Sequence, residues 1–164
     1  FFSRLLAFWH SFCTYNRAER RQRGAPTAMG YYIVVTNNVL CRDRYQDTCR
    51  VEYQEDWTYL DVLLRARDLV HTGAQLITHP MAGSLKPNQT PYRSVVLGTG
   101  TMEDKEPLED VMLMENSIDS CQKFLRGRPL PNWPEDIKKD FRTLDLSFID
   151  GAMARAPRRP GITE

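Results

Sequence analysis

Apolar stretches with the spacing of strands alternate with stretches of helical spacing between residues 31 and 156 of this 164-residue chain. Runs rich in β-branched and aromatic residues predict four strands, at 31–35, 50–55, 76–78 and 94–98. Apolar positions three and four residues apart predict a short helical turn at 39–45 and helices at 58–71 and 107–127, from 134 and from 145. Strands that alternate with helices indicate an α/β domain.

The order of these elements predicts a small three-layer sandwich. We expect a mostly parallel four-stranded sheet of the Rossmann-like or flavodoxin-like kind, with C-terminal helices. The first strand is apolar without alternation, which is typical of a strand covered on both faces. If the first and third strands are neighbours, the polar residues that follow each of them meet in one crevice at the carboxyl edge of the sheet.

Polar residues at helix ends predict the local boundaries. Thr58 is expected to cap the second helix, and Asp61 to pair with Arg65 one turn later. Asp145 is expected to cap a separate last helix, whose buried side carries apolar residues from Leu146 onward.

The loop between the third and fourth strands is where we expect the function. Prolines at 80, 87 and 91 stiffen it, and glycine gives it one permissive backbone position. The candidate ligand-binding residues are the polar residues of this loop and of the segment after the first strand: Thr36, Asn37, Asn38, His79, Gly83, Ser84, Lys86, Asn88, Thr90 and Tyr92. The backbone amides of Gly83 and Ser84, with the ammonium group of Lys86, form a pattern suited to an anion.

Catalysis receives less support from the same loop. His79 and Ser84 suggest a hydrolase, but a nucleophilic serine needs a carboxylate to orient the histidine, and the loop contains no acidic residue. The spacing of a nucleotide-binding phosphate loop is absent, and the three histidines do not form a zinc pattern. We therefore expect no catalytic residue, metal or cofactor. A small hydrolase or transferase acting on a phosphorylated or acyl metabolite is the alternative.

Charge is distributed unevenly along the chain. The whole sequence has 22 basic and 21 acidic residues, but residues 31–150 hold 14 of the basic and 19 of the acidic ones. This acidic body argues against binding to nucleic acid, which requires clustered lysine and arginine.

The cysteines and the hydropathy indicate a cytoplasmic protein. Cysteines 13, 41, 49 and 121 form no Cys-x-x-Cys motif, and we expect reduced thiols, with a disulfide between 41 and 49 as the alternative. No stretch reaches the roughly 18 apolar residues that a membrane span requires.

The two ends of the chain stand apart from the domain expected at 29–156. Residues 1–28 combine an apolar run with a basic block, which fits an amphipathic membrane-surface helix, a targeting segment, or sequence upstream of a true start at Met29. We favour the last interpretation and expect this extension to be non-native or disordered. Residues 157–164 are expected to be a disordered tail.

Four stretches of the sequence carry a family resemblance. The GrdX family is resembled by the segments Ile33-Val-Val-Thr-Asn-Asn, Tyr59-Leu-Asp-Val-Leu, Arg67-Asp-Leu-Val-His-Thr-Gly and Leu76-Ile-Thr-His-Pro-Met-Ala-Gly-Ser-Leu-Lys-Pro-Asn-Gln-Thr-Pro-Tyr-Arg-Ser. These are small proteins encoded with the glycine reductase system of amino-acid-fermenting anaerobic bacteria. The resemblance covers about residues 31–154. It implies a cytoplasmic, anaerobic setting and an accessory role beside a selenium- and thiol-dependent reductase, and it assigns no role to individual residues. We expect the protein to bind a reductase component or a small anionic metabolite in the crevice formed by residues 36–38 and 79–92.

Overall fold

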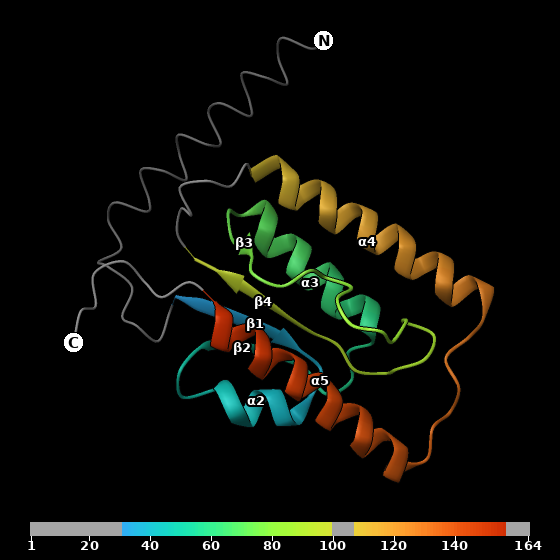
Figure 1. The fold of residues 1–164 in the computed structure, drawn as a ribbon. Helices are drawn as coiled ribbons and strands as arrows, with labels where there is room; N and C mark the ends of the chain where they lie inside the picture. The colour runs from blue at the N-terminus through green and yellow to red at the C-terminus, as the bar shows by residue number, and fades with distance from the viewer. Residues whose placement is uncertain (1–30, 100–106, 157–164) are drawn as a thin grey trace, which may run out of the picture.

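A four-stranded sheet with helices on both faces forms the centre of the molecule (Figure 1). The structure is a computed structural model that describes residues 31–99 and 107–156, so the expectations for residues 1–28 and 157–164 lie outside the described residues. In chain order the elements are β1 (Tyr32–Thr36), α2 (Val39–Tyr45), β2 (Arg50–Tyr53), α3 (Tyr59–His71), β3 (Gln75–Leu76), β4 (Ser94–Gly98), α4 (Pro107–Gly127) and α5 (Glu135–Arg155).

The sheet is mixed, so the prediction of a mostly parallel sheet was wrong. Its order is β2-β1-β4-β3, in which β1 runs parallel to β2 and antiparallel to β4, and β3 runs antiparallel to β4. The reason lies in residues 77–93, which contain no helix. A parallel neighbour needs a crossover connection, usually a helix, whereas an antiparallel neighbour can be reached by a loop that turns back. As a result β4, and not β3, lies beside β1.

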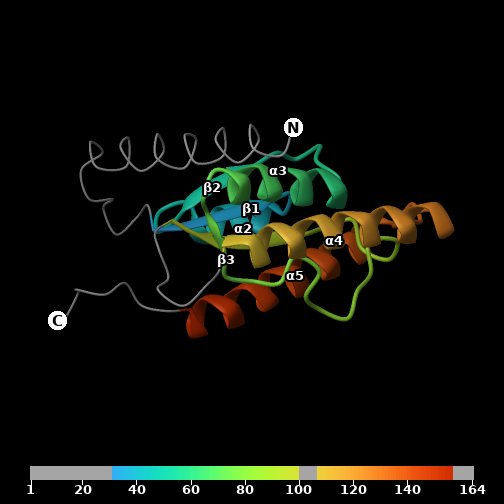
Figure 2. The same cartoon turned by 90° about the horizontal axis from the view of Figure 1, so that it is seen from above.

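The core fills both sides of the two central strands. Alternate residues of a strand point to opposite faces of the sheet. Ile33, Val35, Val95 and Leu97 pack against α3 and α4, while Val34 and Val96 pack with α2 and α5. Figure 1 shows α4 and α5 as long helices that run along opposite faces of the sheet, and Figure 2 shows both helices from above. The expected coverage of β1 on both faces is thus confirmed.

Polar side chains cap the N-termini of α2 and α3, and the cap of α3 by Thr58 confirms the prediction. The side chain of Asn38 accepts a hydrogen bond from the backbone of Leu40 at 3.0 Å, and Thr58 and Asp61 form a reciprocal capping box. The expected pair between Asp61 and Arg65 was wrong. The Asp61 carboxylate accepts from Thr58, and Arg65 instead pairs with Glu52 on β2.

Helix α5 is continuous over 21 residues, whereas the sequence predicted two helices separated at Asp145. Asp145 lies in the middle of this helix and accepts hydrogen bonds from Asn38 and Ser94, which lie far away in the sequence. The polar side chain that suggested a helix start therefore makes a tertiary contact.

Three absences bear on function within the described ranges. No helix there combines the length and apolar character needed to cross a bilayer. The same residues contain no group of three or more His, Cys, Asp or Glu side chains placed to hold a metal ion. Cys41, Cys49 and Cys121 are buried and unpaired, while Cys13 lies outside the described residues.

Candidate functional site

The polar residues at the end of β1 and just after it contact the end of the long loop through the pairing of β1 with β4, whereas the sequence had predicted their meeting from a pairing of β1 with β3. Thr36 pairs with Ser94 in the register of β1 and β4, and their hydroxyl oxygens are 2.6 Å apart. Asn37 donates to the carbonyl oxygen of Pro91 at 2.8 Å and accepts from the backbone of Arg93 at 2.8 Å. Both residues of this segment are buried, so they anchor the loop to the sheet.

A cluster of buried polar side chains holds the carboxylate of Asp145. Its Oδ2 accepts hydrogen bonds from the Ser94 hydroxyl at 2.6 Å and from Asn38 Nδ2 at 2.9 Å, with Cys41 Sγ at 3.5 Å. Asn38 and Ser94 are fully buried. Burial and the neighbouring Asp145 raise the pKa of the Cys41 thiol, which therefore stays protonated at neutral pH. The donors on Oδ2 fix the orientation of the carboxylate.

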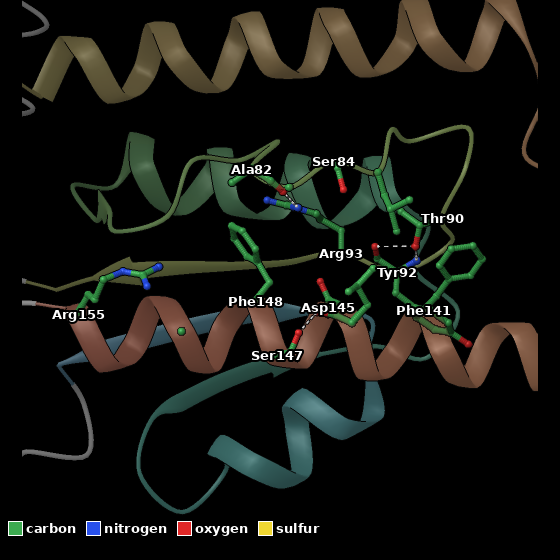
Figure 3. A pocket seen from close by; sticks show the side chains of 14 residues that line it. Ala82, Ser84, Thr90, Tyr92, Arg93, Phe141, Asp145, Ser147, Phe148 and Arg155 are labelled. Atoms are coloured by element: carbon green, nitrogen blue, oxygen red, sulfur yellow. Dashed lines mark hydrogen bonds between the residues drawn. The ribbon is translucent and has the colours of Figure 1, made fainter.

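A cavity of about 350 Å³ lies between the long loop and α5 (Figure 3). The loop side contributes small and polar residues together with Arg93, and α5 contributes aromatic, aliphatic and charged side chains. The lining consists of Ala82, Gly83, Ser84, Leu85, Thr90, Tyr92, Arg93, Phe141, Leu144, Asp145, Ser147, Phe148, Gly151 and Arg155. Figure 3 shows Asp145 and Phe148 rising from α5 toward Arg93 on the opposite wall.

Arg93 is a buried cation, 6% exposed, in the wall of this cavity. Its guanidinium donates to the carbonyl oxygens of Ala82 at 2.6 Å and His79 at 2.9 Å, and it lies near the rings of Tyr59 and Phe148. Its Nε has no hydrogen-bond partner among the residues that the structure describes. Among the described residues no carboxylate forms an ion pair with Arg93. Because a buried charge without a counter-charge costs free energy, the Arg93 guanidinium is a candidate contact for an anion.

Four of the predicted loop residues line the cavity: Gly83, Ser84, Thr90 and Tyr92. Gly83 has a φ of +105°, a conformation that other residues adopt only with strain. The backbone N–H groups of Gly83 and Ser84 donate to no other described residue, and both residues are exposed. Their donors are therefore free to bind a ligand.

The other loop candidates lie elsewhere. The Lys86 ammonium lies 5.1 Å from the centre of the Phe124 ring, and Lys86 and Asn88 line a second hollow against the end of α4. His79 lines a third hollow, and its Nδ1 accepts from the backbone N–H of Met81. The hydrogen bonds of the described residues do not join His79 to the Ser84 hydroxyl. The structure distributes the predicted loop residues over three hollows, and Thr36, Asn37 and Asn38 line none of the three.

Three charged residues of the cavity, Arg93, Asp145 and Arg155, were missed as ligand contacts in the sequence. Arg93 immediately precedes the buried strand β4, and a charge at such a position was a usable signal. Asp145 lies four residues after Phe141 and three before Phe148, so helical periodicity places all three on one face of α5. A carboxylate on an otherwise apolar inward face indicates a specific contact.

Comparison with known proteins gave one match. A protein-family model described as "GrdX-like protein" matches residues 33–154. This range contains every residue of the cavity lining except Arg155. No curated protein and no solved structure matches the chain.

Proposed function

The chain belongs to the GrdX-like protein family, and from this membership we propose that it is a cytoplasmic accessory protein of the glycine reductase system that binds a small anionic metabolite. The setting is the one that the sequence resemblance implies. The binding site in this proposal is the cavity between the long loop and α5. The role is binding, either to carry or sense the metabolite or to present it to a reductase component.

The observation that carries the proposal is the buried guanidinium of Arg93 without a carboxylate partner. Its two hydrogen bonds to carbonyl oxygens fix its position but do not neutralise its charge. An anion in the cavity would supply the missing counter-charge. The free N–H groups of Gly83 and Ser84, with the Ser84 hydroxyl, offer further donors on the same wall.

The size and lining of the cavity favour an organic anion. A volume of about 350 Å³ lies in the range of small-molecule sites and far exceeds the need of an inorganic ion. Phe141, Leu144 and Phe148 supply apolar surface opposite the polar loop. A carboxylic acid or an acyl phosphate with a short apolar body would use both walls.

Titration calorimetry with acetate, 3-phenylpropionate, acetyl phosphate and phosphate tests the proposal. We expect an organic anion to bind more tightly than phosphate. Arg93→Gln should weaken binding at least tenfold, and Ser84→Ala should weaken it several-fold without lowering the melting temperature, because Ser84 is exposed.

Lys86→Ala is the matched control, since it removes a cation of the same loop that lies in another hollow. We expect the affinity of this variant for the organic anion to stay within twofold of the affinity of the unmodified protein. The proposal fails if no anion of the set binds at millimolar concentration. It also fails if Lys86→Ala abolishes binding while Arg93→Gln does not.

A small enzyme, a hydrolase or transferase acting on a phosphorylated or acyl metabolite, is the second candidate. The observation in its favour is Asp145, a carboxylate held in fixed orientation at the cavity wall, as a general base would be. Acetyl phosphate should be incubated with the protein and its hydrolysis followed. Turnover that Asp145→Asn abolishes would replace the binding proposal.

A further inference from the structure

The carboxylate of Asp145 has one oxygen committed to the protein and one available. Oδ2 accepts from Ser94 and Asn38, at 2.6 and 2.9 Å. Oδ1 accepts no hydrogen bond from the part of the chain that the structure describes, and Asp145 lines the cavity. Figure 3 shows the carboxylate pointing away from α5, toward the loop wall. The available oxygen is an acceptor for a ligand.

Asp145 and Arg93 carry opposite charges in the same cavity without pairing. Within the described residues neither forms an ion pair of 4 Å or less with any side chain. Arg155 adds a second guanidinium to the lining. A simple anion would satisfy Arg93 but would meet the negative charge of Asp145 across the same small volume. A simple cation would meet the converse conflict.

We propose that the ligand is a small zwitterion that resolves both conflicts at once. Its ammonium group donates to Oδ1 of Asp145, and its acidic group accepts from the N–H groups of Gly83 and Ser84 with the charge of Arg93 behind them. This inference rests on the proposed function and narrows its ligand class. It also gives a role to the negative charge of Asp145, which binding of a simple anion would leave uncompensated.

The apolar part of the lining selects among zwitterions. Phe141 and Phe148 flank Asp145 on the same face of α5, so they lie beside the bound ammonium group. Such a surface suits the side chain of an apolar amino acid better than a polar one. A metal ion at Asp145 is disfavoured, because within residues 31–99 and 107–156 no three acidic, histidine or cysteine side chains gather.

Matched compounds with one carbon skeleton test the charge requirement. Calorimetry should compare phenylalanine, 3-phenylpropionate and 2-phenylethylamine, and likewise leucine, 4-methylpentanoate and 3-methylbutylamine, with glycine as the smallest zwitterion. We expect at least one amino acid to bind ten times or more tighter than both its acid and its amine. Leucine and phenylalanine should bind more tightly than glycine.

Asp145→Asn tests which residue binds the ammonium group. This substitution should weaken binding of the amino acid at least tenfold. It should leave the affinity for the matching acid unchanged or higher, because the amide removes the negative charge at nearly constant shape. Asp140→Asn is the control, since it makes the same change at an exposed position of α5 outside the lining. Melting temperatures of both variants establish that they are folded.

The two proposals fail in different ways. If the acids bind as tightly as the amino acids, or if Asp145→Asn weakens both equally, the zwitterion inference is overturned while anion binding stands. If the amines bind as tightly as the amino acids, or if no compound with an acidic group binds, the proposed function is overturned, and the inference with it.

Discussion

Replacing Asn38 by aspartate would test the polar cluster that holds α5 on the sheet. Asn38 is fully buried and performs two tasks with opposite ends of one amide. Its oxygen caps α2, and its Nδ2 donates to the carbonyl of Arg142 at 2.8 Å and to Asp145 at 2.9 Å. Aspartate keeps the capping oxygen and the shape, so the change isolates the donor role.

The expected cost follows from what the new carboxylate faces. The cap, worth about 1 kcal/mol, is retained. The lost donor leaves the Arg142 carbonyl without this partner and sets two carboxylates against each other at the present 2.9 Å. A buried charge without compensation costs about 3–5 kcal/mol, and we expect a loss of this size in the free energy of unfolding at pH 7.5.

The pH dependence has a defined sign. In the folded variant one carboxyl of the pair has a raised pKa, because two close carboxylates cannot both ionise cheaply. A proton shared between them restores a hydrogen bond, so the loss should shrink to about 1–2 kcal/mol at pH 5.

Urea denaturation of the variant and of the unmodified protein at both pH values measures these losses. The control is Asn132→Asp, at an exposed position of the connector before α5. Its free energy of unfolding should stay within about 0.5 kcal/mol of that of the unmodified protein at both pH values. A loss under about 1 kcal/mol for Asn38→Asp at pH 7.5, or one that does not change with pH, would refute the structural role of this contact.

Three further predictions concern the cavity and the thiols. Gly151→Ala should stabilise α5 by up to about 1 kcal/mol, measured as a higher melting temperature, because the added Cβ meets only the Arg155 guanidinium at 3.8 Å. The same substitution should weaken ligand binding, because the added methyl group reduces the volume of the cavity. Gly83→Ala should cost about 1–2 kcal/mol by denaturation, owing to the positive φ, although no atom lies within 4 Å of the new Cβ. In a Cys13→Ser background no thiol of the native protein should react with a disulfide reagent at pH 8, since Cys41 and the other two cysteines are buried, whereas three should react after unfolding.

The raised pKa of Cys41 also gives stability a pH dependence. Because burial holds the folded-state pKa above the ordinary value of about 8.5, the thiol's contribution is complete below that pH and is lost as the pH rises further. Denaturation curves between pH 7 and 10 should show this decline, and Cys41→Ala should show less of it. An equal decline in both proteins would contradict the assignment.

Local features of the fold could be predicted from the sequence, and pairings could not. Strands β1 and β4 and the cap of α3 depend on residues close together in the chain, and the sequence predicted each of them. Strand order depends on whether the chain between two strands crosses over or turns back. Residues 77–93, between β3 and β4, have no helical pattern, and this was the feature that indicated an antiparallel pair. The strands themselves were placed with small errors, for example 50–55 against Arg50–Tyr53.

The same division holds for the candidate site. The loop was identified as a polar, ordered segment, and four of its predicted residues line the cavity. Lys86 could not be separated from them, because its position depends on Phe124 of α4, distant in the sequence. Thr36 and Asn38 were predicted as ligand contacts, and the structure places them under Asp145 in the buried network. The sequence could not reveal this network, because it forms only where α5 packs on the sheet and brings Asp145 to these two residues.

Helix α5 is the last described element in chain order, and this has a consequence for synthesis on the ribosome. Until α5 emerges, Val34 and Val96 are covered on their side of the sheet only by α2, and the cavity has one wall. Domains generally fold as units, and exposed apolar surface invites aggregation. Under the proposed function, a chain that stops before α5 lacks one wall of the cavity and cannot bind the ligand. Such a product would also leave Val34 and Val96 partly uncovered, which favours aggregation.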